Sequence, residues 1–400
     1  MVNQMRIGII TFHFPYNCGA TLQCAALQTC LEKMNQDVCV INYRPWYHQN
    51  RYIPLKNPFY YAFKCMRKRR GSDKILRRLA RGVYGFIQVV YSWRHYRNTA
   101  AQHRRFETFI ENNLRQTRVY RTLKRLQVSP PPCDLYISGS DQLWNAHLTE
   151  GEFDPAYFLD FGSKETVRVS YAVGTNFDGM EQISESLTGL LSRLDAISLR
   201  ETKFQDAIRS AAPNTPIHID LDPTFLLEAR DYEPMICQRP LESEPFILTY
   251  TMPDDSQHKV YNAAKIFGEK MKMKVIDVSG NPSKVNAKIA DHRICGPDEF
   301  LWYIKNASYV MTNSFHGTAF SVNFRKQFIV IPHMKTGNRV EELLDKMKLS
   351  SRVKRTGTDA AKAIAEPIDY TETDQQLAQL RKESIHYLQE CLSISKGKLG

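Results

Sequence analysis

The stretch Met311-Thr312-Asn313-Ser314-Phe315-His316-Gly317-Thr318-Ala319-Phe320 places a histidine where an apolar strand gives way to a turn of small residues. In doubly wound α/β domains such strand ends face the ligand crevice. The next helix begins there with free backbone N–H groups that favour anions. The pattern therefore predicts that His316 lies beside an anion site. The alternative is an imidazole that is satisfied by hydrogen bonds within its own turn.

Three other segments show the same change from an apolar strand to a small or polar turn. Ile7–Phe12 is a short apolar run, His13–Ala20 is rich in turn residues, and Thr21–Gln28 has apolar residues at helical spacing. This order of strand, loop and helix is the opening half of a βαβ unit. Leu135–Asn145 and Ala196–Glu201 repeat the strand and turn. The sequence therefore predicts an α/β fold.

Six short motifs follow one another along the chain: Asn17–Gln23, Gly139–Asn145, Ser170–Ala172, Leu199–Glu201, Asp222–Thr224 and Asn313–Gly317. As an ordered set they resemble the polysaccharide pyruvyl transferase family, whose members move the enolpyruvyl carbon skeleton of phosphoenolpyruvate onto a sugar as a cyclic ketal. The resemblance extends from Ile7 to about Arg339. It implies two Rossmann-like domains that face each other across a cleft, as in GT-B glycosyltransferases. Some members carry an arginine where this chain has Phe315.

The chain length predicts two domains, because 400 residues exceed what one ordinary hydrophobic core organises. We expect a first domain over residues 1–227, interrupted by a basic helical insertion over 46–130. A second domain is expected over 228–370. Three prolines at 130–132 end the insertion, since proline disfavours helix at its own position and just before it. Residues 371–400 are expected to form a helix that crosses back to the first domain.

The positive charge of the chain is concentrated in the insertion. Between Lys64 and Arg125 there are 18 basic residues against three acidic ones, a local charge of +15 in a chain whose total is +12, so the rest sums to −3. Aromatic and aliphatic residues interleave with the basic ones. This mixture fits a helix on an anionic membrane surface, and it fits equally well a solvated helical pair with a buried face. No helix-turn-helix signature, RNP-like string or zinc finger is present, which argues against nucleic acid.

Cysteine spacing and hydropathy exclude several classes of protein. The nine cysteines include no C-x-x-C pair and no zinc spacing, which predicts reduced thiols and no metal site. The apolar segment Gly82–Trp93 is much shorter than the roughly 20 residues that span a bilayer. Met1–Arg6 lacks the features of a secretory signal. We expect a cytoplasmic protein, peripheral on the inner face of the membrane, that uses no cofactor.

His316 and Asp141 are the predicted catalytic residues. Ketal formation requires protonation of the methylene carbon of phosphoenolpyruvate, which one positioned acid can perform. Histidine titrates near neutral pH and pairs with phosphate when charged, so His316 is the predicted acid. Asp141 is the predicted base for the attacking sugar hydroxyl. Phosphate is itself a good leaving group, so the chemistry requires no metal.

The predicted binding residues form two groups. The donor, which carries a phosphate and a carboxylate, is expected to contact Arg200, Ser314, Asn313 and Arg339. The acceptor sugar, expected to be lipid-linked, is predicted to contact Asn17, Gly19, Gln23 and Asn145. A guanidinium binds carboxylate or phosphate through two parallel hydrogen bonds, which favours Arg200 as the clamp. The alternatives are a surface arginine at Arg200 and an ion pair of Arg339 with Glu341 or Glu342.

Two other functions remain open from the sequence. One is a glycosyltransferase of the GT-B kind that uses a nucleotide sugar in the same cleft. The other is a glycan- or lipid-binding relative without turnover, for which Phe315 is the main indication. Binding of a nucleotide would favour the first, and phosphate release from phosphoenolpyruvate would argue against both.

Overall fold

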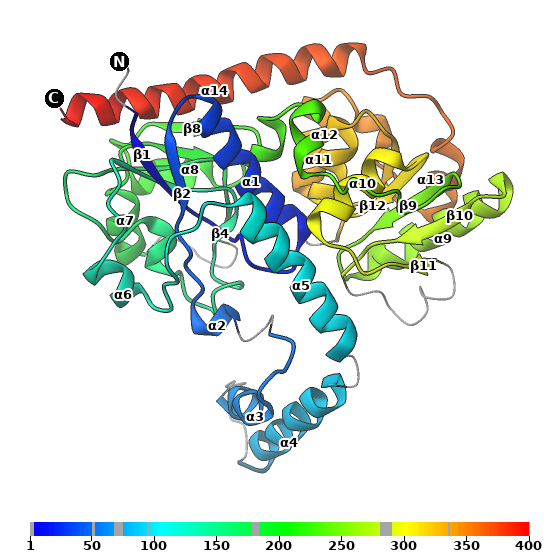
Figure 1. The fold of residues 1–400 in the computed structure, drawn as a ribbon, viewed down its shortest axis with the longest axis horizontal. Helices are drawn as coiled ribbons and strands as arrows, with labels where there is room; N and C mark the ends of the chain where they lie inside the picture. The colour runs from blue at the N-terminus through cyan, green and yellow to red at the C-terminus, as the bar shows by residue number, and fades with distance from the viewer. Residues whose placement is uncertain are drawn as a thin grey trace.

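The computed structural model describes residues 4–49, 53–67, 75–93, 96–177, 184–280, 290–334 and 337–399. Two domains built on parallel sheets lie side by side, and the C-terminal helix α14 (Thr371–Leu399) runs along both of them (Figure 1). The predicted α/β class is therefore confirmed.

The first domain contains two sheets of four parallel strands. The first sheet, in the order β2-β1-β3-β5, comprises β1 (Arg6–Ile10), β2 (Asp37–Val40), β3 (Leu135–Ser138) and β5 (Val167–Ser170). The second, in the order β4-β6-β7-β8, comprises β4 (Asp141–Asn145), β6 (Val173–Asn176), β7 (Ile197–Leu199) and β8 (Ile217–Ile219). Its helices include α1 (Cys18–Lys33), α7 (Glu185–Leu191) and α8 (Gln205–Ala211). The sequence predicts a helix near residues 181–193, which corresponds to α7. The first residues of that prediction, 181–183, lie outside the described residues.

The two sheets of the first domain continue into each other. Strand β3 leads into β4, and β5 leads into β6, with only two residues at each junction. A bridge between Val169 and Ala196 joins the sheets laterally. Asp141, directly after the first junction, and Ala172, within the second, have φ of +74° and +45°, the left-handed region that non-glycine residues rarely occupy. The chain therefore turns sharply where Ser140 and Asp141 reach the carboxyl edge of the first sheet.

The second domain has one sheet of five parallel strands in the order β11-β10-β9-β12-β13. They are β9 (Phe246–Tyr250), β10 (Lys274–Asp277), β11 (Asp291–His292), β12 (Tyr309–Thr312) and β13 (Gln327–Val330). Its helices include α9 (Asp255–Met271), α10 (Pro297–Asn306), α11 (Phe315–Asn323), α12 (Asn338–Lys346) and α13 (Gly357–Ala363). Strand β9 is buried throughout, as expected for a strand covered on both faces. The strand, turn and helix predicted from Met311–Phe320 are β12 and α11.

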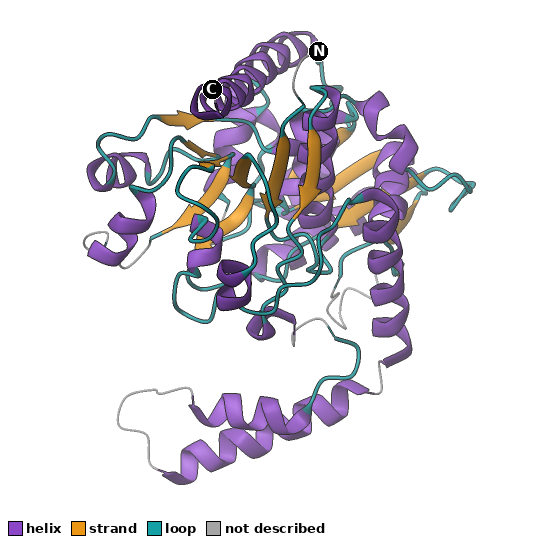
Figure 2. Ribbon diagram, turned by 60° about the vertical axis from the view of Figure 1, so that its left-hand side comes forward, coloured by secondary structure: helices purple, strands orange, loops and turns teal. Residues whose placement is uncertain are grey.

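The segment 46–130, predicted as one helical insertion, has one part that packs on the body of the protein and another that projects from it. Its helices are α2 (Trp46–Gln49), α3 (Pro58–Arg67), α4 (Ile75–Ser92), α5 (Tyr96–Asn113) and α6 (Leu123–Val128). Helix α5 belongs to the body, because Phe106 and Ile110 are buried in the same cluster as Phe300 of α10. Only α3 and α4 project from the body, as a hairpin (Figures 1 and 2).

Helix α14 is tied to the first domain by hydrogen bonds. The Tyr387 hydroxyl donates to the Ser170 carbonyl at 2.8 Å, and the Ser384 hydroxyl accepts from the Leu221 amide at 3.0 Å. Arg381 donates to the Phe225 carbonyl at 2.6 Å. The helix therefore leaves the second domain and ends on the first.

Two kinds of feature are absent from the described residues. No helix among them is long and apolar enough to cross a membrane. No group of three or more His, Cys, Asp and Glu side chains within the described ranges is arranged to hold a metal ion.

Candidate functional site between the two domains

A cavity of about 380 Å³ lies between the two domains. The first domain contributes Asn17 and Asp141, and the second contributes Ser314, His316 and Arg339. These residues lie at carboxyl ends of parallel strands and at the first turns of α11 and α12, where open α/β sheets bind ligands. With Asn313, which also lines the cavity, the structure brings together six of the sequence-predicted site residues.

His316 is the second residue of α11, whose cap is the Ser314 hydroxyl, which accepts from the Gly317 amide at 3.4 Å. The side chain is 10% exposed, and its Nε2 lies 3.7 Å from Oδ2 of Asp222. That separation is too long for a hydrogen bond. Among the described residues Nε2 has no hydrogen-bond partner. The alternative of an imidazole satisfied within its turn is therefore not what the structure shows.

Asp222 is the buried centre of the site. Its Oδ2 accepts from Arg200 Nη1 at 2.8 Å and from the Ser140 hydroxyl at 3.0 Å, while Oδ1 accepts from the Thr224 amide at 3.0 Å. Burial raises the pKa of Asp222, but His316, Arg200 and the Thr224 N–H outweigh burial and hold this pKa well below its usual range. Asp222 is therefore a fixed negative charge beside the imidazole.

Arg200 is a buried cation rather than a surface arginine, since its side chain is only 3% exposed. Burial lowers its pKa, but the carboxylates of Glu201, Asp222 and Asp141 outweigh burial and raise it. The guanidinium carbon lies 4.6 Å from the centre of the Phe315 ring, a cation–π contact. In the part of the chain that the structure describes, Arg200 Nη2 has no hydrogen-bond partner. One N–H group thus stays available after the ion pairs are made.

Arg339, in the first turn of α12, reaches the site from the second domain. Its Nη1 lies 3.5 Å from Oε1 of Glu201, so the ion pair joins the two domains. The predicted alternative, a pair with Glu341 or Glu342, is wrong, because these carboxylates pair with Arg355 and Lys346.

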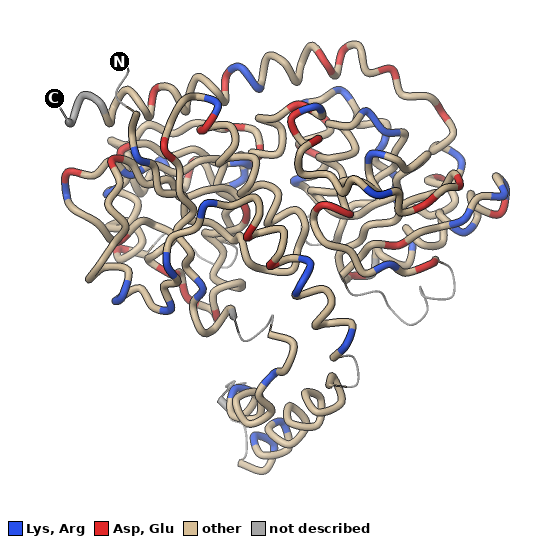
Figure 3. Tube along the Cα trace, in the orientation of Figure 1, with Lys and Arg blue, Asp and Glu red and all other residues tan. Residues whose placement is uncertain are grey.

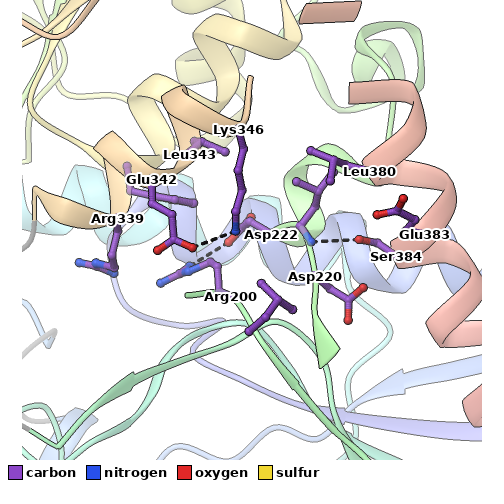
Figure 4. Close-up of a pocket in the computed structure, with 13 residues that line it drawn as sticks. Arg200, Asp220, Asp222, Arg339, Glu342, Leu343, Lys346, Leu380, Glu383 and Ser384 are labelled. Carbon is purple, nitrogen blue, oxygen red and sulfur yellow. Dashed lines mark hydrogen bonds and ion pairs between the residues drawn. The ribbon is translucent and has the colours of Figure 1, made fainter. Parts of the chain in front are cut away.

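A second, smaller cavity of about 40 Å³ lies against Arg200. Figure 4 shows it between α12, which carries Arg339 and Lys346, and α14, which carries Ser384. Asp220 and Asp222 line the same cavity. Helices α12 and α14 therefore enclose Arg200 from the side.

Asp141 and Asn17 line the larger cavity, and each also has a local structural bond. Asp141 Oδ1 accepts from the Gln142 amide at 2.8 Å. Asn17 caps α1 by accepting from the Ala20 amide at 3.3 Å and also accepts from the Tyr250 hydroxyl at 3.5 Å. Asp141 keeps a second carboxylate oxygen, so its predicted role as a base is geometrically feasible.

Asn313 lines the cavity, but its amide is engaged within the protein. Oδ1 accepts from the Met252 amide at 2.6 Å, and Nδ2 donates to the Met252 carbonyl at 2.8 Å and to the Ser256 hydroxyl at 2.9 Å. Asn313 therefore holds two loops of the second domain together. A contact with the donor would compete with these bonds and stays a prediction.

Three residues predicted to bind the acceptor lie outside the cavity lining. Gln23 donates to the Thr11 hydroxyl at 2.9 Å, and Asn145 donates to Gln142 Oε1 at 3.1 Å. Gly19 packs against His316: a Cβ on Gly19 would lie 2.1 Å from His316 Cγ. The structure therefore places these residues in supporting positions, and acceptor binding by them stays a prediction.

Asp222 and Glu201 are the site residues that sequence reasoning did not assign. Both occur in motifs that were recognised, Asp222–Thr224 and Leu199–Glu201, but only the folded chain shows that their carboxylates neutralise Arg200. The available signal was an aspartate before a proline, a pattern typical of a capping position. Asp222 does cap the short 3-10 helix Pro223–Phe225.

Comparison with solved structures shows what fold the chain has. A Listeria monocytogenes protein described as a putative UDP-N-acetylglucosamine 2-epimerase has a TM-score of 0.50 at 9% identity, over 94% of this chain and 91% of that one. MnaA of S. aureus, solved with UDP, has a TM-score of 0.49 at 10% identity with the same coverage. The fold is GT-B-like, with two Rossmann-like domains that face a cleft.

Sequence comparison identifies the family. Residues 17–334 match the polysaccharide pyruvyl transferase family. The match covers well over half of the chain, which therefore belongs to this family and is a transferase. A search of curated proteins finds no match.

Proposed function

We propose that the protein transfers pyruvate from phosphoenolpyruvate to two hydroxyls of a sugar in a surface-glycan precursor, as a cyclic ketal. The supporting observation is the His316 imidazole, whose Nε2 has no hydrogen-bond partner among the described residues and lies 3.7 Å from the ionised Asp222. The imidazole therefore keeps a ring nitrogen that can bond to a ligand and transfer a proton to it.

In the proposed reaction His316 donates its proton to the methylene carbon of phosphoenolpyruvate. This forms a methyl group and an oxocarbenium-like centre at C2. One sugar hydroxyl attacks C2 and gives its proton to Asp141. The C2–O bond to phosphate then breaks, and the second hydroxyl closes the ketal and returns its proton to His316. Inorganic phosphate takes the proton held by Asp141, so both residues are restored.

The negative charges of the donor are proposed to interact with the N-termini of α11 and α12 and with the positive charges of Arg200 and Arg339. Asp222 and Glu201 largely neutralise Arg200 and Arg339, so the ion pairs leave little free positive charge. The N-termini of α11 and α12 both open at the cavity, and a helix N-terminus carries about half a positive charge. The guanidinium of Arg339 lines the cavity and supplies further donors, whereas Arg200 lines the smaller cavity and contacts the Phe315 ring that lies between them.

Phe315 is compatible with donor binding. The ring lines both cavities and lies under the Arg200 guanidinium. A phenylalanine there holds the guanidinium plane without adding a second cation. Phe315 thus contacts Arg200 at the position where some relatives carry an arginine.

Phosphate release tests this proposal and separates it from its alternatives. The protein is incubated with phosphoenolpyruvate and a panel of lipid-linked sugars, and inorganic phosphate is measured. Acceptor-dependent release supports pyruvyl transfer. Thermal stabilisation by UDP with no release from phosphoenolpyruvate indicates a nucleotide-sugar glycosyltransferase instead. Sugar binding with neither effect indicates a binding protein without turnover.

We further propose that the α3–α4 hairpin rests on the anionic inner face of the membrane, where a lipid-linked acceptor would be found. Helices α3 and α4 contain Lys64, Arg67, Arg77, Arg78 and Arg81 and no acidic residue (Figure 3). The basic run continues into Lys68–Arg70, which lies outside the described residues. This charge suits a surface rich in anionic lipids.

The hairpin packs its glycines inward and its large apolar residues outward. A Cβ on Gly82 would lie 2.7 Å from Met66 Cγ, and one on Gly85 would lie 2.8 Å from Cys65 Sγ. Meanwhile Leu76, at 77% exposed, and Val83, at 60%, face away from the partner helix. Close packing through small residues is typical of helices in an apolar solvent. The outer face of α4 is therefore suited to the lipid boundary.

A further inference from the structure

A groove of about 1080 Å³ separates the hairpin from the body of the first domain. Its volume exceeds the roughly 300–1,000 Å³ of most small-molecule sites. The lining includes aromatic residues from α2, from the segment before α2 and from α3: Tyr43, Trp46, Tyr47, Tyr60 and Phe63. The facing wall is the segment from 147 to 155. No residue predicted from the sequence to bind a substrate lies in this groove.

The aromatic wall is held in place by one carboxylate. The hydroxyls of Tyr43 and Tyr47 both donate to Oδ2 of Asp154, at 2.8 and 2.5 Å. Trp46 beside them is 57% exposed, with the guanidinium of Arg121 5.1 Å from its ring centre. The two tyrosines are thus fixed in orientation, and Trp46 lines the groove with Arg121 over one face of its ring. Ordered, exposed aromatic surface in a hollow is a feature of ligand sites.

The polar groups of the groove are of mixed sign. Lys64 forms an ion pair with Glu150, which links α3 to the body. Arg121 and Lys64 face three carboxylates of the lining, those of Glu150, Glu152 and Asp154. The groove therefore lacks the excess of positive charge that would attract a polyanion. Its combination of aromatic faces and hydrogen-bonding edges suits a neutral, hydroxyl-rich ligand.

The groove adjoins the interdomain cavity through a shared wall. His48 and Leu148 line the cavity, whereas Tyr47, His147 and Thr149 line the groove. Neighbouring residues of α2 and of the 147–149 turn therefore line the cavity and the groove in turn. The Tyr47 and His48 rings are stacked, with centres 5.9 Å apart. The cavity and the groove therefore lie on opposite sides of the same short segments of the first domain.

We propose that this groove binds the sugar chain of the acceptor beyond the residue that is modified in the cavity. Sugar rings stack their apolar faces on Trp46 and Tyr60, and their hydroxyls bond to the carboxylate edges. The groove lies between the hairpin and the cavity, the path that an acceptor anchored in a membrane would follow. The proposal rests on the proposed function, since it takes the acceptor to be a glycan.

Direct binding to an array of bacterial surface oligosaccharides of increasing length tests the groove. The unmodified protein should bind chains of several sugars and bind single sugars weakly. Trp46→Ala and Tyr60→Ala should each weaken binding of the longer chains by roughly tenfold, the effect of losing one stacked ring. Tyr96→Ala is the matched control, because Tyr96 is 42% exposed and lies outside the groove lining.

The outcomes separate this inference from the proposed function. The inference is overturned if the unmodified protein binds no chain on the array, or if both groove variants bind long chains as well as the Tyr96→Ala protein does. Phosphate release from phosphoenolpyruvate is measured in parallel with a short acceptor and should be unchanged in all three variants. Groove-dependent binding without any phosphate release would support the groove and contradict pyruvyl transfer.

Discussion

Three buried side chains, those of Asp222, His316 and Arg200, lie next to one another in this site. Asp222 lies 3.7 Å from His316 Nε2 and 2.8 Å from Arg200 Nη1, so one carboxylate orients the Arg200 cation and lies close to the imidazole. Removing either partner of a buried ion pair leaves an uncompensated charge, which typically costs about 3–5 kcal/mol. His316 Nε2 lies 3.7 Å from Asp222, longer than a hydrogen bond, so removing the imidazole breaks no hydrogen bond of Asp222. Catalysis and folding are therefore separable at His316 but not at Asp222.

We predict that His316→Ala lowers kcat by a factor on the order of 10² to 10⁴, the usual range for losing a general acid. The measurement is phosphate release at saturating phosphoenolpyruvate, with circular dichroism to confirm folding. His258→Ala is the control, since His258 is an exposed histidine of α9. A folded His316→Ala protein with near-normal turnover would remove His316 from the mechanism.

Asp220 is predicted to make stability depend on pH. Burial raises its pKa from 3.8 to about 6, against the lowering effect of the Ser198 and Ser384 hydroxyls. The folded state therefore holds this proton more tightly than the unfolded state. The stabilisation is complete below pH 3.8 and is lost as pH rises through about 6, by up to roughly 3 kcal/mol.

Urea unfolding at pH 4.5 and pH 7.5 checks this prediction. Asp220→Asn keeps an acceptor for the Ser198 hydroxyl, which lies 2.6 Å from Oδ2, but cannot ionise. Relative to the unmodified protein, the variant should gain stability at the higher pH. Unfolding free energies of the two proteins that change in parallel with pH would contradict the assignment.

At the level of elements, helix ends and the hairpin carry the functional features. Helices α11 and α12 both begin at the cavity, so the partial positive charges of two helix N-termini lie beside the same space. Helix α5, in contrast, is embedded in the core through Phe106 and Ile110 although it is part of the basic segment. The positive charge of the basic segment therefore did not distinguish the projecting helices α3 and α4 from the packed helix α5.

The hairpin is predicted to bind anionic vesicles. Arg77→Glu with Arg78→Glu, both exposed on α4, should weaken binding to phosphatidylglycerol vesicles by at least roughly tenfold, since each cation near the surface contributes about 1 kcal/mol. Binding should also weaken as salt rises, because such attraction is screened within about 10 Å at 0.1 M salt. Sedimentation with vesicles measures both effects.

The control for the hairpin is an equal change of charge elsewhere. Lys124→Glu with Arg125→Glu alters two exposed residues of α6, off the hairpin, by the same amount. This protein should bind vesicles nearly as the unmodified one does. If the unmodified protein fails to bind vesicles even at low salt, the membrane proposal is wrong, and the hairpin is a packing element or a contact surface for another protein.

At the scale of the whole molecule, the cleft depends on how closely the domains approach. The tightest point is Gly19 of α1, where an added Cβ would lie 2.1 Å from His316 Cγ. The buried cluster that includes Leu22, Phe300 and Phe320 continues across the same contact. Helix α14 adds bonds from the end of the chain to the first domain.

We predict that Gly19→Ala lowers the free energy of unfolding by roughly 1–3 kcal/mol, as for overpacking, and reduces turnover by displacing His316. Gly189→Ala in α7 is the matched control, because an added Cβ at Gly189 would have no other atom within 4 Å among the described residues. Alanine there should stabilise the helix by roughly 0.5–1 kcal/mol. Thermal unfolding measures the stability of the two variants, and phosphate release measures their turnover. Equal stability and turnover in Gly19→Ala and Gly189→Ala would contradict the close contact at Gly19.

The sequence by itself determined the α/β class, the turn that begins α11 and the position of His316 at the start of that helix. These features follow from local periodicity and turn chemistry, which are set by neighbouring residues. Only the tertiary structure decided that Asp222 joins His316 and Arg200, that Arg339 pairs with Glu201, and that Gln23 supports the site instead of lining it. Buried charges find partners that are distant in sequence when domains dock, and that docking depends on side-chain packing that no local pattern records.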